Sequence, residues 1–364
     1  MISEPRLPAA APCTGGPNLA WLARLIRLAR LARLAAVALL LAGASGLAQA
    51  AQGYEARDDR GQLLRFAAPP QRVVSLLPSI TESICALGAC QRLAGVDRYA
   101  NWPASVQALP RVGGGQDPDV EAILALKPDL VFMAAGSRAA PRLQALGLRV
   151  AQLDTRTQAD VRRVLHTLAA MLALPGGQAE QTWQSIENAV DEAARGMPAQ
   201  ARGASVFFEV SSGPYAAGES SFIGETLQRL GVRNVVGAAL GPFPHLNPEY
   251  VLEHRPDVLM ATSRSQLAAQ PYPGWEKLPA WREGRLCIFN AEETDTLIRP
   301  GPRMAEAARL MPAAWPKKRR AQALARPAQR PGPEAPEYLT APGALCGPPF
   351  SGRAPRRSTI YLAI

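Results

Sequence analysis

Val120-Glu-Ala-Ile-Leu-Ala-Leu-Lys-Pro-Asp-Leu-Val-Phe-Met-Ala134 returns in outline as Pro248-Glu-Tyr-Val-Leu-Glu-His-Arg-Pro-Asp-Val-Leu-Met-Ala261, 128 residues later in a chain of 364 residues. In both copies a glutamate opens a helix with apolar periodicity, a basic-Pro-Asp turn ends it, and a short apolar run follows as a buried strand. One recurrence at so long an interval indicates two similar α/β lobes rather than a solenoid of short repeats. Two lobes imply a cleft between them, where ligands commonly bind.

The order of the predicted elements divides the rest of the chain. After a strand pair within residues 54–66, strands and helices alternate up to residue 156, which predicts a parallel sheet. Residues 157–200 are helical in character, and a helix over 178–195 would be about 30 Å long, enough to run from one lobe to the other. Alternation then resumes. We therefore predict an amino-terminal lobe at 51–156, a helical connector at 157–200 and a carboxy-terminal lobe at 201–316.

Two local patterns lead to further structural expectations. Ser79-Ile-Thr-Glu82 matches a capping box, in which the serine caps a helix and the glutamate folds back onto the cap. Arg303 begins a helix with good periodicity, and we expect Met311-Pro312 to interrupt it because proline removes a helical hydrogen bond.

The formal charge of +10 lies at the two ends of the chain. Residues 1–50 contribute +4 and residues 317–364 contribute +7, so residues 51–316 sum to −1. A nucleic-acid-binding surface would need a basic face on the folded part, so we expect no nucleic-acid partner. Residues 317–364 are rich in proline, arginine and alanine without periodicity, which predicts disorder. A basic tail that binds nucleic acid or membrane is the alternative.

The amino-terminal residues have the pattern of an export signal. Arg24, Arg27, Arg30 and Arg33 precede a short apolar run, and small residues follow up to Ala48-Gln-Ala50. This pattern predicts a cleaved signal peptide at 1–50, with an amphipathic or membrane-spanning helix as the alternative. No cysteine follows the apolar run directly, so we expect a soluble, exported protein that is not a lipoprotein.

The chain contains five cysteines, of which Cys85, Cys90 and Cys287 fall within the predicted lobes. Cys85 and Cys90 flank the end of a predicted helix, and this spacing allows either a short disulfide in an oxidising compartment or two buried thiols. Cys287 lies in an apolar strand and is expected in the core. A Cys-x4-Cys spacing alone is a weak metal signal, and we predict no metal site.

No catalytic motif is present in the sequence. It contains no phosphate-binding loop, no nucleophile elbow and no dinucleotide-binding glycine pattern. We therefore predict a protein that is not an enzyme and holds no cofactor of its own. His245, in a proline-rich loop, either faces the cleft or is an ordinary surface residue.

Aromatic side chains are expected on the loops that follow strands, the rim that opens toward a ligand between the lobes. Tyr99, Tyr215 and Phe243 occupy such positions and would suit a large, flat, apolar ligand. Asp295 and Arg299 add a polar pair, either a clamp on the ligand or a simple local ion pair.

Together these segments resemble a known family: periplasmic substrate-binding proteins of ABC importers for cobalamin, haem and iron-siderophores. The resemblance runs from about residue 71 to 311. It rests on residues 73–82, on Gly95-Val-Asp-Arg-Tyr-Ala-Asn-Trp-Pro103, on Val112-Gly-Gly, on residues 121–131 and on Arg299-Pro-Gly-Pro-Arg303.

The resemblance implies an α/β fold of two Rossmann-like lobes with parallel sheets, joined by one long rigid helix. It further implies that Glu121 and Glu249 dock onto the importer's transmembrane permease. Cobalamin-binding members are the most similar, because their cleft aromatics match Tyr99, Tyr215 and Phe243 and their polar pair matches Asp295 and Arg299. We accordingly expect a monomer that captures cobalamin as cargo and delivers it to an ABC importer. Haem or a ferric siderophore is the alternative ligand.

Overall fold

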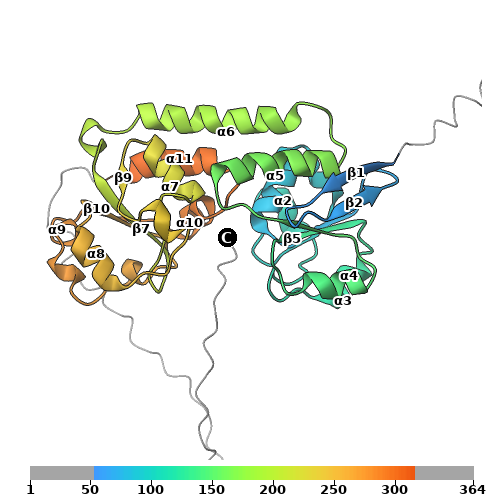
Figure 1. Ribbon diagram of the computed structural model, residues 1–364, viewed down its shortest axis with the longest axis horizontal. Helices are drawn as coiled ribbons and strands as arrows, with labels where there is room; N and C mark the ends of the chain where they lie inside the picture. The colour runs from blue at the N-terminus through green and yellow to red at the C-terminus, as the bar shows by residue number, and fades with distance from the viewer. Residues whose placement is uncertain (1–52, 316–364) are drawn as a thin grey trace, which may run out of the picture. The chain divides into compact units, whose positions relative to one another are not determined.

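The computed structural model describes residues 53–315 (Figure 1). Within this range, the residues from Glu55 onward belong to one compact unit. The predicted signal peptide at 1–50 and the predicted disordered tail at 317–364 lie outside the described residues. Within the described part, no helix combines the length and the apolar character that crossing a membrane requires.

The amino-terminal lobe is built on a four-stranded parallel sheet with the order β4-β3-β5-β6. A separate two-stranded sheet, β1-β2, precedes it. The strands are β1 (Tyr54–Arg57), β2 (Leu63–Phe66), β3 (Val73–Ser75), β4 (Leu93–Val96), β5 (Leu130–Ala134) and β6 (Val150–Leu153). The helices of this lobe are α2 (Pro78–Ala86), α3 (Val120–Ala125) and α4 (Ala140–Ala145). The core on the α3 and α4 side contains Val74, Val131 and Met133 from the strands and Ile123 and Leu143 from the helices.

The carboxy-terminal lobe repeats this plan with the strand order β11-β10-β7-β8, and β9 pairs with β7. All its pairings are parallel except that of the short β8. The strands are β7 (Ser205–Ser211), β8 (Tyr215–Ala216), β9 (Arg233–Asn234), β10 (Val258–Ala261) and β11 (Leu286–Ile288). The helices are α7 (Phe222–Arg229), α8 (Pro248–His254), α9 (Pro279–Arg282) and α10 (Ala291–Leu297). Phe207 meets Trp275 edge to face at 5.5 Å in the core of this lobe.

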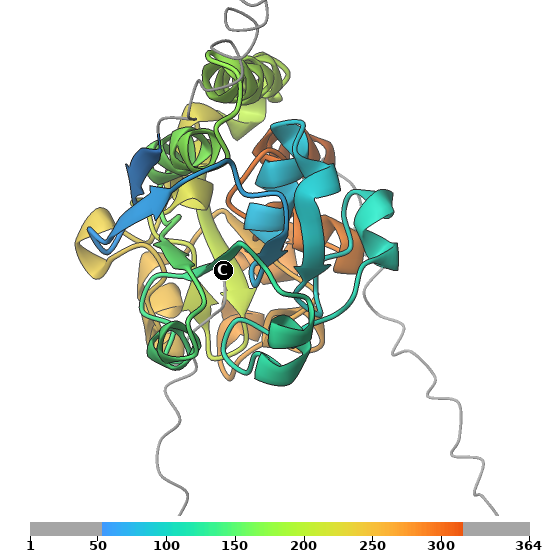
Figure 2. The same cartoon turned by 90° about the vertical axis from the view of Figure 1, so that its right-hand side faces the viewer.

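The connector consists of α5 (Gln158–Met171) and α6 (Gln178–Arg195), and the bounds predicted for the long helix are confirmed. Helix α6 buries Trp183, Ile186 and Val190, which recur at the helical period. It packs against α5 and against the last helix, α11 (Met304–Ala314). Figure 1 shows α6 as one unbroken helix, and Figure 2, viewed nearly along it, shows α5 beside it. A continuous helix is a stiff link between two lobes.

Short 3-10 turns complete the fold. They are η1 (Cys90–Arg92), η2 (Ala104–Ala108), η3 (Ala199–Ala201), η4 (Ala238–Leu240), η5 (Gln266–Ala268) and η6 (Trp275–Lys277).

The sequence repeat is a structural repeat, because the same local contacts recur in both lobes. Asp119 caps α3 and Asn247 caps α8, each accepting a hydrogen bond from a backbone N–H of the first turn. Lys127 and Arg255 then end the two helical segments with φ of 46° and 43°, a left-handed conformation that non-glycine residues seldom adopt. The basic-Pro-Asp turns are therefore the same turn, built twice.

The aspartate of each turn ties the repeat to the neighbouring strand. The Asp129 carboxylate accepts the backbone N–H groups of Gln71 and Arg72, just before β3, at 2.7 and 2.8 Å. The Asp257 carboxylate accepts both the N–H and the hydroxyl of Ser205, the first residue of β7, at 2.8 and 2.7 Å. Each turn thus sets the start of the strand that pairs with β5 or β10.

Two expectations about helix ends are wrong. Helix α2 begins at Pro78 with Leu77 as its cap and no side-chain cap bond, and Glu82 faces away toward other partners instead of closing a capping box. Pro312 lies inside α11, which continues to Ala314. Pro312 removes one helical hydrogen bond, and buried Met311 and Trp315 hold this end of the helix against the protein despite that loss.

Cys85 and Cys90 form a disulfide between the end of α2 and η1, with their Cα atoms 4.1 Å apart. Of the two arrangements that the spacing allowed, the structure has the disulfide. Cys287 is buried in β11, as expected, and burial raises the pKa of its thiol to about 12.

Replacing the aspartate of the second turn should destabilise the carboxy-terminal lobe. Asp257→Ala leaves two donors of Ser205 without their acceptor, so we expect the free energy of unfolding to fall by about 1–3 kcal/mol. Chemical denaturation measures this change. Glu253→Ala, at an exposed position of α8, is the control and should change stability by less than about 0.5 kcal/mol. Equal effects of the two substitutions would contradict the anchoring role.

Candidate functional site

The candidate site lies on the loops at the carboxyl ends of the parallel strands. In an open parallel sheet these loops share one edge, where ligands characteristically bind. Tyr99 lies on the loop after β4, and Tyr215 lies opposite Ser211, the last residue of β7. His245 forms a bridge with Tyr215 and so lies at the same edge of its lobe.

The predicted aromatic residues differ in how far they are exposed. Tyr99 is 56% exposed, and the guanidinium of Arg98 lies 6.0 Å from its ring centre. Tyr215 is half-buried, and its ring lies 4.8 Å from that of exposed His245. Phe243 is also half-buried and packs 5.9 Å from Phe222 of α7. Tyr99 is the most exposed of the three predicted aromatic side chains, and Tyr215 with His245 forms a second aromatic surface on the other lobe.

Asp295 joins the loops of the two lobes. One of its carboxylate oxygens accepts from Arg264, on the loop after β10, at 2.6 Å. The other accepts from Asn101, on the loop after β4, at 2.9 Å and forms an ion pair with Arg299 at 2.9 Å. Arg264 remains exposed on the outer side of this cluster. The two lobes are therefore held together by polar bonds at the edge where their loops meet.

Arg299 is buried inside that junction. Its side chain is only 6% exposed and donates to Glu82 of α2 at 2.7 Å, to the Asn101 amide oxygen at 2.7 Å and to the Tyr99 carbonyl at 3.0 Å. The local ion pair with Asp295 exists, but most partners of Arg299 belong to the other lobe. In this structure the hydrogen bonds of the Arg299 guanidinium go to other groups of the protein, whereas Asp295 is partly exposed.

Two carboxyl groups beside Arg299 are almost fully buried. Burial raises the pKa of Glu82 to about 7, although the nearby guanidinium of Arg299 opposes the shift. Burial likewise raises the pKa of Asp97, on the loop after β4, to about 6 against the effect of backbone N–H bonds. Each has one carboxylate oxygen without a hydrogen-bond partner in the structure, Glu82 Oε2 and Asp97 Oδ2. Unpaired buried oxygens make ionisation costly.

The predicted docking glutamates occupy equivalent positions. Glu121 and Glu249 are each the second residue of their helix, α3 and α8, and both are exposed. Each helix starts from a loop at the carboxyl edge of its sheet, so the two carboxylates flank the aromatic loops. Figure 1 shows α3 and α8 on the side of the molecule away from α6.

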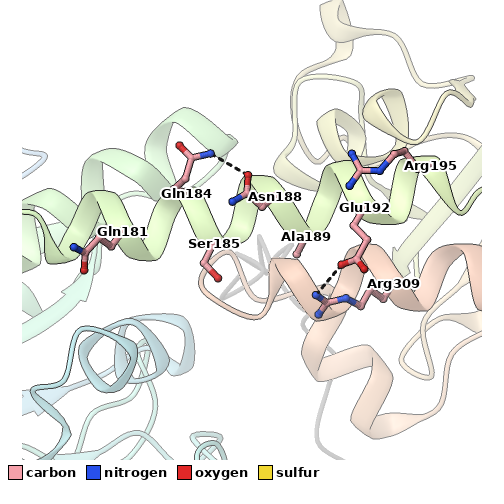
Figure 3. A pocket seen from close by; sticks show the side chains of 8 residues that line it. All are labelled: Gln181, Gln184, Ser185, Asn188, Ala189, Glu192, Arg195 and Arg309. Atoms are coloured by element: carbon pink, nitrogen blue, oxygen red, sulfur yellow. Dashed lines mark hydrogen bonds and ion pairs between the residues drawn. The ribbon is translucent and has the colours of Figure 1, made fainter.

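Two further features of the described residues concern metal ligands and surface hollows. No group of three His, Cys, Asp or Glu side chains within residues 53–315 is arranged to hold a metal ion. A hollow of about 590 Å³ lies along α6, away from the aromatic loops (Figure 3). It is lined by Gln181, Ser185 and Asn188 on α6, with the Glu192–Arg309 ion pair at one end.

Sequence reasoning missed the residues that join the lobes. Glu82 was interpreted as a capping residue because its spacing from Ser79 fits a capping box, and nothing local indicated a partner 217 residues away. Asn101 and Arg264 lie in loops whose polarity is ordinary. The clue that was available is the concentration of arginine and proline in residues 299–303, a segment too rigid and too charged for an ordinary surface loop.

Two α/β lobes joined by a stiff helix, with aromatic and polar loops meeting at one edge, define a two-lobed binding protein. The chain belongs to the periplasmic binding protein family, which matches residues 73–292. This is a family of binding proteins, in keeping with the fold and with the parallel sheets of both lobes.

Known relatives agree with this class but are named for different ligands. The vitamin B12-binding protein of Vibrio cholerae is 27% identical over 253 residues, covering 67% of this chain and 89% of that protein. An uncharacterized ABC transporter substrate-binding lipoprotein of Bacillus subtilis is also 27% identical, over 68% of this chain and 81% of its own length. The structure of the periplasmic heme-binding protein RhuT from Roseiflexus sp. RS-1 has a TM-score of 0.57 at 25% identity, covering 67% of this chain and 97% of that one.

The buried carboxyl groups should make stability depend on pH. Both pKa values are higher in the folded than in the unfolded protein, so their contribution is complete below pH 4 and is lost as the pH rises through 6 and 7. We expect the melting temperature to fall by several degrees between pH 5.5 and 8.5. Scanning calorimetry at several pH values tests this. Glu82→Gln should flatten the fall, and an unchanged slope in this variant would show that Glu82 does not cause it.

Proposed function

We propose that this protein is the periplasmic substrate-binding component of an ABC importer and that it captures cobalamin as cargo. The observation that supports the ligand class most directly is the pair of aromatic surfaces, exposed Tyr99 on one lobe and Tyr215 with His245 on the other. Such faces favour a large planar ligand by stacking and apolar burial. Binding, without covalent chemistry, is then the whole activity of the protein.

The polar residues at the edge favour a neutral or weakly charged ligand. Arg264 and Arg98 are the cations named at this edge that remain exposed, and each is already paired, with Asp295 at 2.6 Å and with Asp117 at 2.6 Å. A strongly anionic chelate would call for several unpaired arginine or lysine side chains. Both a vitamin B12-binding and a heme-binding relative have this fold, so haem is the second candidate. Asp295 would serve as a polar contact to the ligand, and Phe243 as a partly buried support.

We further propose that the protein acts in the periplasm as a monomer after removal of residues 1–50. The Bacillus subtilis relative is named a lipoprotein. The present chain has no cysteine directly after its apolar run, so we infer that it is released without a lipid.

Direct titration of the exported protein tests the ligand. We expect cyanocobalamin to bind, and haemin and a ferric hydroxamate to bind more weakly or not at all, as measured by calorimetry. Tyr99→Ala should weaken cobalamin binding about tenfold or more, because it removes a stacking face. Tyr99→Phe should bind nearly as well as the natural protein. Leu146→Ala is the matched control, since Leu146 is an exposed apolar residue at the opposite, amino-terminal edge of the strands. Tight haemin binding without a cobalamin signal would overturn the proposed ligand.

Docking is tested separately from binding. We propose that Glu121 and Glu249 meet arginine residues on the two halves of the permease. The double variant Glu121→Ala/Glu249→Ala should reduce uptake by cells strongly while leaving the affinity for cobalamin unchanged. Glu253→Ala, one turn further along α8, should leave both properties unchanged. A loss of affinity in the double variant would place these carboxylates in the ligand site instead.

A further inference from the structure

The strongest contact between the lobes involves a segment that follows α10. Arg299 begins this segment and reaches Glu82 of α2 and the loop after β4. Arg303 ends it, with its guanidinium 4.0 Å from the same Glu82 carboxylate and 5.5 Å from the ring centre of Trp102. Two arginines from one side thus approach one carboxylate on the other. We call residues 299–303 the latch segment.

The latch segment also shields Glu82 from water. Gly301 lies so close to α2 that a Cβ atom there would be 3.4 Å from both the Ser79 carbonyl oxygen and the Ser83 hydroxyl oxygen. Glu82 itself has no exposed surface. If the latch segment moves away from α2, water gains access to this carboxyl group.

The charged groups around Glu82 come from the latch segment, from α10 and from the loop after β4. The latch segment supplies Arg299 and Arg303, and α10 supplies Asp295. The loop after β4 supplies Asp97, which contacts Arg299 electrostatically and lies beside Arg111. One proton on Glu82 therefore changes the net charge of a largely buried cluster of three carboxyl groups and two latch arginines.

We propose that Glu82 and the latch segment form a proton-linked latch between the two lobes, which closes when Glu82 carries a proton and loosens when it ionises. The direction follows from burial. Ionised Glu82 would leave Oε2 unpaired and unsolvated, so raising the pH favours the arrangement that admits water. The raised pKa of Glu82 agrees with this direction. Buried Glu82 in the closed form binds a proton more tightly than a hydrated Glu82 would in the open form, so protonation favours closure. This latch does not depend on which ligand the protein binds.

The structure leaves room for the latch segment to move. A hollow of about 430 Å³ separates α6 from Ala86 of α2, from Pro302 of the latch segment and from Ala305 of α11. It adjoins the hollow in Figure 3, since Gln181 and Ser185 line both. Movement of the latch segment toward α6 would therefore meet free space before it met the connector helix.

Hydrogen–deuterium exchange of the ligand-free protein at pH 6 and pH 8.5 tests the latch. After correction for the intrinsic pH dependence of exchange, amides in residues 78–86 and 296–304 should open about tenfold more often at pH 8.5, which is the ratio expected for one carboxyl group with pKa values of about 4.5 open and about 7 closed. In Glu82→Gln this ratio should fall close to one, because the amide cannot ionise.

Glu306→Gln is the matched control. Glu306 bonds to Arg303 at 2.9 Å but is half-exposed, so this variant should keep the tenfold ratio. Two results would overturn the proposal: equal corrected exchange at the two pH values in the natural protein, or a tenfold ratio that persists in Glu82→Gln. If Glu82→Gln fails to fold, the measurement on the natural protein decides alone. Failure of the latch would leave the titration with cobalamin unaffected, so the two proposals can be told apart.

Discussion

The direction of the strands determines where this protein can bind a ligand. Every strand of the amino-terminal sheet, and every strand but β8 of the other, runs parallel, so the loops that follow the strands gather at one edge of each lobe. The anchored turns at Asp129 and Asp257 tie the starts of β5 and β10 to those of β3 and β7 in the same way in both lobes. The positions of the aromatic residues and of the exposed glutamates at this edge are consistent with the parallel direction of the strands.

The loop edges of the two lobes are held together by bonds between the lobes. A buried, charged side chain makes most of these bonds. Arg299 is held by a carboxylate, an amide oxygen and a backbone carbonyl from the amino-terminal lobe. A buried charge of this kind contributes little net stability but is costly to leave without its partners, so it specifies an arrangement more than it strengthens one. Together with the continuous helix α6, it favours a binding protein whose lobes move little.

The sequence predicts well those parts of this molecule that depend on local pattern, and physical reasons explain why. Helix α6 has a regular apolar stripe and its predicted bounds are confirmed. The basic-Pro-Asp turns contain their own helix-ending residues, so residues 127–129 and 255–257 could be identified from local pattern. The disulfide was one of two arrangements that the spacing of Cys85 and Cys90 allowed.

What the sequence could not show are contacts between distant residues. Glu82 and Arg299 are 217 positions apart, and each has a simpler local interpretation, as a capping residue and as half of an i,i+4 ion pair. The exposure of Tyr99 and the meeting of Tyr215 with His245 likewise depend on tertiary packing. The fold does not determine the ligand, because relatives named for vitamin B12 and for heme share it. The ligand depends on the individual side chains of the loops.

The central claim is that one planar ligand lies between loops of both lobes. Hydrogen–deuterium exchange with and without saturating cyanocobalamin tests it most directly, because it locates protection along the chain. We predict slower exchange in residues 97–102 of the amino-terminal lobe and in residues 211–216 and 243–247 of the carboxy-terminal lobe, with no change along the outer face of α6. Protection confined to one lobe, or found along α6 instead, would contradict this account.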